Sequence, residues 1–206
     1  MNKRISKRIV WSTVAGLGVL AIVAAVFLLA GPTAYAAQVG GISVSEEELE
    51  TEIKSCVMLG KTAADLRELT YAVASVKVMR EQIQGTEYDL PEGYEKEIRK
   101  ESREKANDDS PELTEQLQSW KLTREELADI LYSMMLDTEI QSRYVQMMAP
   151  KAVAENPDET DPYVLVEKID AYVEEIVAEL PEIQFNQDAV KRIEAFAAEK
   201  GIEFAA

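Results

Sequence analysis

The stretch Thr123-Arg124-Glu125-Glu126-Leu127-Ala128-Asp129-Ile130-Leu131 decides the fold, because it opens the longest amphipathic segment of the chain. Its first four residues form a capping box, a pattern in which the Thr123 and Glu126 side chains each bond to the other residue's backbone N–H. Apolar residues then lie along one side of the predicted helix: Leu127, Leu131, Met134, Tyr144, Val145 and Met148. We therefore expect a helix over 124–148 that Pro150 ends.

Shorter elements are expected on both sides of this helix. Ser45-Glu46-Glu47-Glu48 is a second capping box, and Val39-Gly40-Gly41-Ile42 is typical of a hairpin with a two-residue turn. Apolar periodicity predicts further helices near residues 46–59, 63–84, 113–120, 162–180 and 187–200. Short strands are expected near 183–185 and 202–204. The expected fold class is mostly α with a few short β-strands.

Two segments are expected to bury little. Residues 91–105 carry only Tyr94 and Ile98 as large apolar residues, and their opposite charges recur at i, i+4 spacing. That pattern predicts a solvated helical arm, and the alternative is an arm that embraces a binding partner. Residues 150–162 are polar and proline-rich, which predicts a linker.

The first 37 residues have the composition of an export signal. Four basic residues (Lys3, Arg4, Lys7 and Arg8) precede the uncharged run 9–30, and Ala34-Tyr35-Ala36 supplies small residues that a signal peptidase accepts. The run is longer than an ordinary signal core and close to the length of a membrane span. Residues 1–37 are thus a cleaved signal peptide or a retained membrane anchor helix, and both interpretations stay open. Residues 38–206 are expected at the outer face of the bacterial cytoplasmic membrane or secreted.

Composition excludes several kinds of function. The chain has 22 basic and 38 acidic residues, a formal net charge of -16, so it repels nucleic acid and other polyphosphates. It contains no histidine, which excludes Ser-His-Asp catalysis, Cys-His catalysis and His-ligated zinc. The single Cys56 cannot form an intramolecular disulfide, and Asp158, Glu159 and Asp161 do not match the spacing of a calcium-binding loop. No catalytic residue, metal or cofactor is expected.

Two segments resemble a known family. The sequence over 39–49 is similar to the strand-to-helix opening of SurA-like and PrsA-like extracytoplasmic chaperones, and that over 120–131 resembles the motif that opens their long helix. The resemblance covers about residues 38–149 and implies a SurA-N-like helical chaperone domain over 38–206. Gly40 replaces the family's usual Asn. Many relatives carry a parvulin-type prolyl isomerase domain where this chain has only 151–161, and parvulin sites typically use two histidines.

This resemblance implies a protein that binds polypeptides. The leading hypothesis is an ATP-independent chaperone-like module that holds unfolded or newly exported polypeptides, with the membrane as a further partner if residues 1–37 are retained. The alternative is a membrane-anchored interaction subunit with one dedicated protein partner. Prolyl isomerase activity is not expected, because the parvulin domain and the histidines are missing.

The long helix supplies the candidate binding surface. Methionine is flexible and polarizable, so an exposed Met-rich face adapts to many apolar sequences. Adjacent helical residues point about 100° apart, so only one of Met134 and Met135 can face the core. We expect Met135 to be exposed, and we place the surface on Met135, Tyr132 and Met147. The second candidate surface is the charged arm around Tyr94 and Ile98.

Overall fold

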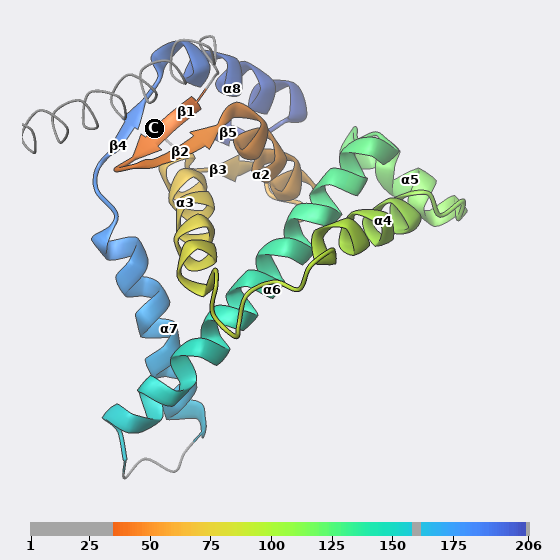
Figure 1. Cartoon of the computed structure of the whole chain (residues 1–206). Coiled ribbons are helices and arrows are strands. Elements are labelled where there is room, and N and C mark those ends of the chain that lie inside the picture. The colour runs from red at the N-terminus through yellow and green to blue at the C-terminus, as the bar shows by residue number, and fades with distance from the viewer. Residues whose placement is uncertain (1–34, 158–161, 205–206) are drawn as a thin grey trace, which may run out of the picture. The chain divides into compact units, whose positions relative to one another are not determined.

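The computed structural model describes residues 35–157 and 162–204, and within them seven helices and five short strands, labelled as in Figure 1. The helices are α2 (Glu46–Met58), α3 (Leu66–Ile83), α4 (Tyr94–Ala106), α5 (Pro111–Trp120), α6 (Arg124–Glu155), α7 (Pro162–Glu179) and α8 (Gln187–Lys200). The strands are β1 (Tyr35–Val39), β2 (Ile42–Ser45), β3 (Ala63–Ala64), β4 (Ile183–Phe185) and β5 (Glu203–Phe204). The prediction of a mostly α fold with a few short strands is confirmed. Within this described part, no helix combines the length and the apolarity that crossing a membrane requires.

Strand β1 is the middle strand of a three-stranded antiparallel sheet with the order β2-β1-β4. The predicted hairpin is present, since Val39 pairs with Ile42 around the Gly-Gly turn. Gly40 has a φ of +64°, and a Cβ there would lie 2.8 Å from the Cγ of Pro181, so only glycine fits this turn. Strands β3 and β5 form a separate parallel pair.

The folded unit begins earlier than the sequence suggested. Strand β1 starts at Tyr35, within the segment 1–37 that we assigned to the signal or anchor, and residues 35–206 form one compact unit. Ala36 and Ala37 are both 0% exposed. These residues therefore belong to the core of the domain, while the apolar run 9–30 lies outside the described residues.

Two large apolar clusters stabilise the unit. The first, here called the sheet cluster, packs the three-stranded sheet against α2, α3 and α8 through buried residues such as Val39, Val44, Leu49, Ile53, Ile183 and Ile193. The second, the bundle cluster, joins α3, α4, α6 and α7 through Met79, Ile83, Ile98, Leu136, Ile140, Tyr144 and Ile176. A smaller cluster around Leu117, Leu127 and Ile130 fixes α5 to the first turns of α6.

The charged segment 91–105 is not a projecting arm. Helix α4 packs along α6 (Figure 1), and its Ile98, Ser102 and Ala106, spaced by four residues, are buried. Most of its charged residues are exposed, and the Nζ of Lys105 is 2.8 Å from a carboxylate oxygen of Glu101. Two others, Glu95 and Arg99, face α3 and α6. Ser102 and Ala106 extend the buried stripe beyond Ile98, and a count of large apolar residues does not include them.

Helix α6 does not end at Pro150 but continues to Glu155. Tertiary contacts explain the extension: Ala152 is buried against Tyr172 of α7, whose hydroxyl donates to Glu155 Oε2 at 2.5 Å. The Lys151 ammonium also lies over the Tyr172 ring, 4.3 Å from its centroid. The predicted linker 150–162 is therefore helical over its first half.

Candidate functional site

The five residues of the two predicted binding surfaces all belong to or pack against the bundle cluster, and they do not form an exposed face. Ile98 is buried in the bundle cluster, and the other four, Tyr94, Tyr132, Met135 and Met147, are partly buried against it. The structure thus gives these side chains a packing role. Tyr132 alone among them also lines the cavity described below.

The predicted orientation of the methionine pair was wrong. Met134 is 39% exposed, whereas Met135 packs against the bundle cluster. Met135 packs against the bundle cluster together with Tyr132, which precedes it by three residues and so lies near it on the helix surface. At the other pair, both Met147 and Met148 are partly buried.

A cavity of about 250 Å³ lies between α2, α3, α4 and α6. One side is apolar and consists of Val73, Val76, Leu136 and Ile140. The volume is below the roughly 300–1,000 Å³ of pockets that hold drug-sized ligands, so the cavity suits a single long side chain better than a cofactor.

The basic residues of the cavity already have partners. They are Lys77, Arg80 and Arg99. The Nζ of Lys77 donates to the carbonyl oxygen of Ser43 at 2.7 Å and to Glu48 Oε2 at 2.8 Å. Arg80 forms an ion pair with Glu95 of α4. The guanidinium of Arg99 lies over the Tyr132 ring, 3.9 Å from its centroid.

Two partly buried carboxylates of the cavity, Glu52 and Asp137, form no ion pair in the described part of the chain, whereas the unpaired Glu47 and Asp129 are exposed. Burial, together with the nearby charge of Asp137, raises the pKa of Glu52 from 4.5 to about 7, and the charge of Lys61 opposes this rise only in part. Burial also raises the pKa of Asp137 from 3.8 to about 6, against the hydrogen bond from the Ser133 hydroxyl at 3.4 Å, and the charge of Glu48 adds to the rise. Neither carboxylate forms an ion pair with any residue that the structure describes. We call these two residues the acidic pair.

Sequence reasoning missed the acidic pair because it searched for purely apolar stripes. The cavity-lining residues of α6 follow helical spacing, but the face mixes acidic, aromatic and aliphatic side chains: Asp129, Tyr132, Ser133, Leu136, Asp137 and Ile140. Such a mixed face fits neither a core nor a solvated surface. This mixture of side chains at helical spacing is the feature of the sequence that could have indicated a cavity.

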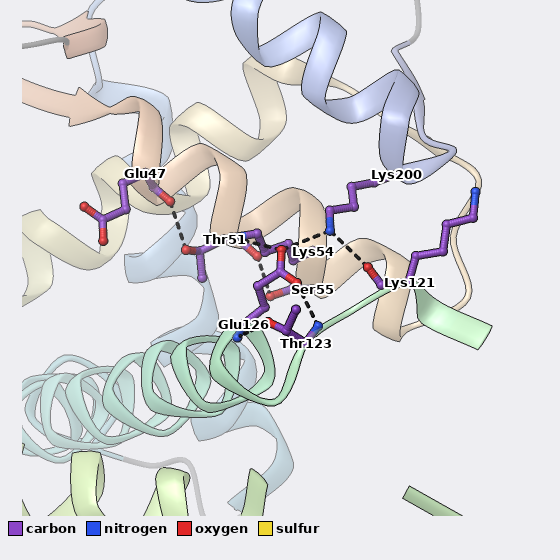
Figure 2. A network of polar contacts seen from close by, with 8 residues as sticks. All are labelled: Glu47, Thr51, Lys54, Ser55, Lys121, Thr123, Glu126 and Lys200. Carbon is purple, nitrogen blue, oxygen red and sulfur yellow. Dashed lines mark hydrogen bonds and ion pairs between the residues drawn. The ribbon is translucent and has the colours of Figure 1, made fainter. Parts of the chain in front are cut away.

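A polar network holds two walls of the cavity in place (Figure 2). The Glu126 carboxylate accepts from the backbone N–H of Thr123 at 2.8 Å, which completes the capping box, and from the Nζ of Lys200 in α8 at 2.9 Å. Lys54 of α2 lies 3.8 Å from the same carboxylate. Burial alone would raise the pKa of Glu126, but these hydrogen bonds and the Lys200 charge outweigh it and hold the pKa below its ordinary value. The network therefore connects α2, α6 and α8.

The structure also bears on metal binding and on Cys56. Among the described residues, no three acidic or cysteine side chains are grouped as metal ligands. The calcium-loop candidates Asp158, Glu159 and Asp161 lie outside those residues. Cys56 is buried in the sheet cluster, and burial raises the pKa of its thiol, which disfavours the nucleophilic thiolate.

Comparisons of the chain with protein-family models, with curated proteins and with solved structures found no match. The likeness to SurA-like and PrsA-like chaperones therefore rests on the two segments 39–49 and 120–131. Both segments open helices with capping boxes, and both boxes are formed in the structure.

Proposed function

We propose that the domain is an ATP-independent, chaperone-like module that holds unfolded or newly exported polypeptides outside the bacterial cytoplasmic membrane. One observation supports this most: a cavity with an apolar wall contains two partly buried carboxylates that form no ion pair with any described residue. The module acts by binding alone. Reversible burial of a client segment lowers the concentration of free unfolded client by mass action and needs no covalent step.

The occupant that the cavity fits best is a lysine or arginine side chain of an extended client segment. The aliphatic stem of such a side chain would pack on Val73, Val76 and Leu136, while its charged end would lie between Glu52 and Asp137. The cavity's own bases do not compete for the acidic pair, because each already has a partner. The charges of the cavity and of a basic side chain are thus complementary.

The test measures holding and selectivity with the full chain in lipid nanodiscs. We expect it to suppress light scattering by several unrelated unfolded proteins, compared with empty nanodiscs. In a fluorescence titration, an apolar peptide with a central lysine should bind about tenfold more tightly than the same peptide with norleucine, which corresponds to about 1.4 kcal/mol. The double variant Glu52→Gln/Asp137→Asn should lose this preference.

A matched control separates the effect of the cavity carboxylates from the effect of the net charge of the chain. Glu115→Gln/Glu199→Gln changes the net charge equally at two exposed positions outside the cavity, and it should keep the lysine preference. If the wild-type chain suppresses no aggregation, the chaperone class is refuted and a single dedicated partner is the better explanation. If the cavity double variant keeps its preference for lysine, the binding site lies elsewhere.

A further inference from the structure

The peptide bond that a signal peptidase would cut lies within the central strand of the sheet. The motif Ala34-Tyr35-Ala36 directs cleavage between Ala36 and Ala37. Both residues are 0% exposed, and β1 pairs with β2 on one side and with β4 on the other. This cut would therefore split β1, with Tyr35 and Ala36 on one product and the rest of the strand on the other.

Cleavage would remove several interactions from the domain. The carbonyl oxygen of Ala36 accepts a hydrogen bond from the backbone N–H of Asn186 at 2.9 Å, which joins the first strand to the start of the last helix. Tyr35, which pairs with Ser45 of β2, would leave as well. The cut would thus take away the acceptor of the Asn186 N–H. A backbone N–H that is left without a partner inside a fold is unfavourable.

Cleavage would also place a charge in the core. Ala37 would become the first residue, and an α-amino group has an ordinary pKa near 7.7–8.0, so most of it is protonated at neutral pH. In the fold, Ala37 lies between Val44 and Phe185, its partners on the two neighbouring strands. Transfer of an ammonium group from water into such a site is strongly unfavourable unless it is paired.

We infer that the working form of this protein is not cut after Ala36, and that the apolar run 9–30 remains attached to the folded domain as its membrane anchor. The sequence alone left signal peptide and anchor open. The position of β1 decides between them, because the strand needs residues that cleavage would remove. This inference is independent of what the cavity binds.

The direct test is the N-terminus of the protein from cells. The full chain, produced in a bacterium and recovered from the membrane, soluble and culture fractions alike, should keep the basic residues and the apolar run, as measured by intact mass and N-terminal sequencing. A folded product that begins at Ala37, or anywhere after Ala30, would overturn the inference.

A second measurement tests the physical reason. Three forms of the domain are compared by thermal unfolding: one that begins at Gly31, one that begins at Ala37 with a free amine, and one that begins at Ala37 with an acetylated amine. We expect the free-amine form to melt about 10 °C or more below the Gly31 form at pH 7. Acetylation should recover much of the lost melting temperature, because the acetyl group removes the charge and supplies a carbonyl where Ala36 had one.

The pH dependence gives the expected signature of a buried amine. The deficit of the free-amine form should shrink when the pH is raised from 7 to 9.5, since the amine is then neutral in the folded and the unfolded chain. Equal melting temperatures for all three forms would overturn the inference, because the strand would then not depend on Tyr35 and Ala36.

Discussion

At the scale of single residues, the acidic pair makes the stability of the domain depend on pH in an unusual direction. Glu52 and Asp137 have higher pKa values in the folded chain than their ordinary values of 4.5 and 3.8. Between about pH 4 and pH 7 the folded state therefore binds more protons than the unfolded state. Their contribution to stability falls as the pH rises through this window, whereas paired carboxylates such as Glu126 contribute in the opposite sense.

We predict that Glu52→Gln raises the free energy of unfolding by about 1–3 kcal/mol at pH 7.5 and by less than about 0.5 kcal/mol at pH 4.5. The neutral amide removes the cost of ionising a buried carboxyl, and at low pH the carboxyl is already neutral. Urea unfolding at both pH values measures this, with the exposed Glu115→Gln as the control. An equal effect at both pH values would show that packing, and not ionisation, explains the change.

The two adjacent methionines of α6 give a second prediction at this scale. Met135→Glu should lower the free energy of unfolding by several kcal/mol, because Met135 packs against the bundle cluster and the new carboxylate would have no partner there. Met134→Glu is the matched control, since Met134 is exposed, and it should stay within about 0.5 kcal/mol of the wild type. Chemical denaturation measures the free energy of unfolding of both variants. A larger loss for Met134→Glu than for Met135→Glu would contradict the orientation of the helix.

At the scale of elements, α6 depends on its neighbours for its last turns. Proline lacks the N–H that an interior helical residue donates, and it disfavours continuation of the helix. The helix nevertheless passes Pro150, because Ala152, Lys151 and Glu155 all contact Tyr172 of α7. Tertiary contacts thus override a strong local signal.

We predict that Pro150→Ala increases the free energy of unfolding by about 1–3 kcal/mol, since alanine restores the missing donor and favours the helix. Guanidinium unfolding measures the change, with Gln141→Ala as a control at an exposed position of the same helix. A destabilised Pro150→Ala variant would indicate that the bend imposed by proline is needed for the contact with α7.

Elements with local signals were predictable from the sequence. Both capping boxes, the Gly-Gly hairpin and the helix end at Gly201 are specified within a few residues, and the structure has each of them. Features that depend on distant segments were not predictable. The docking of α4 on α6 and the raised pKa values of the acidic pair arise only when separate helices meet, and a single sequence carries no record of which helices do so.

At the scale of the whole domain, the two large apolar clusters take their residues from different parts of the described chain. The sheet cluster draws on both its beginning and its end, and the bundle cluster draws on its middle. Helices α3 and α6 lie at the cavity between them, and α3 supplies residues to both clusters. A client side chain in this cavity would thus contact helices that stabilise each cluster.

The pairing of β1 with β4 also sets the order of events when the chain is made. The sheet cluster joins residues 36–74 to residues 180–204, so β1 lacks its partner β4 until the second half of the cluster has been synthesised. Contacts between such distant segments form slowly, because a long loop must close first. The hairpin of β1 and β2 is local, but the sheet stays incomplete while the intervening helices are being added. For the export that we propose, late closure of the sheet would keep the chain open enough to pass through a narrow channel until the strand at Ile183 is made.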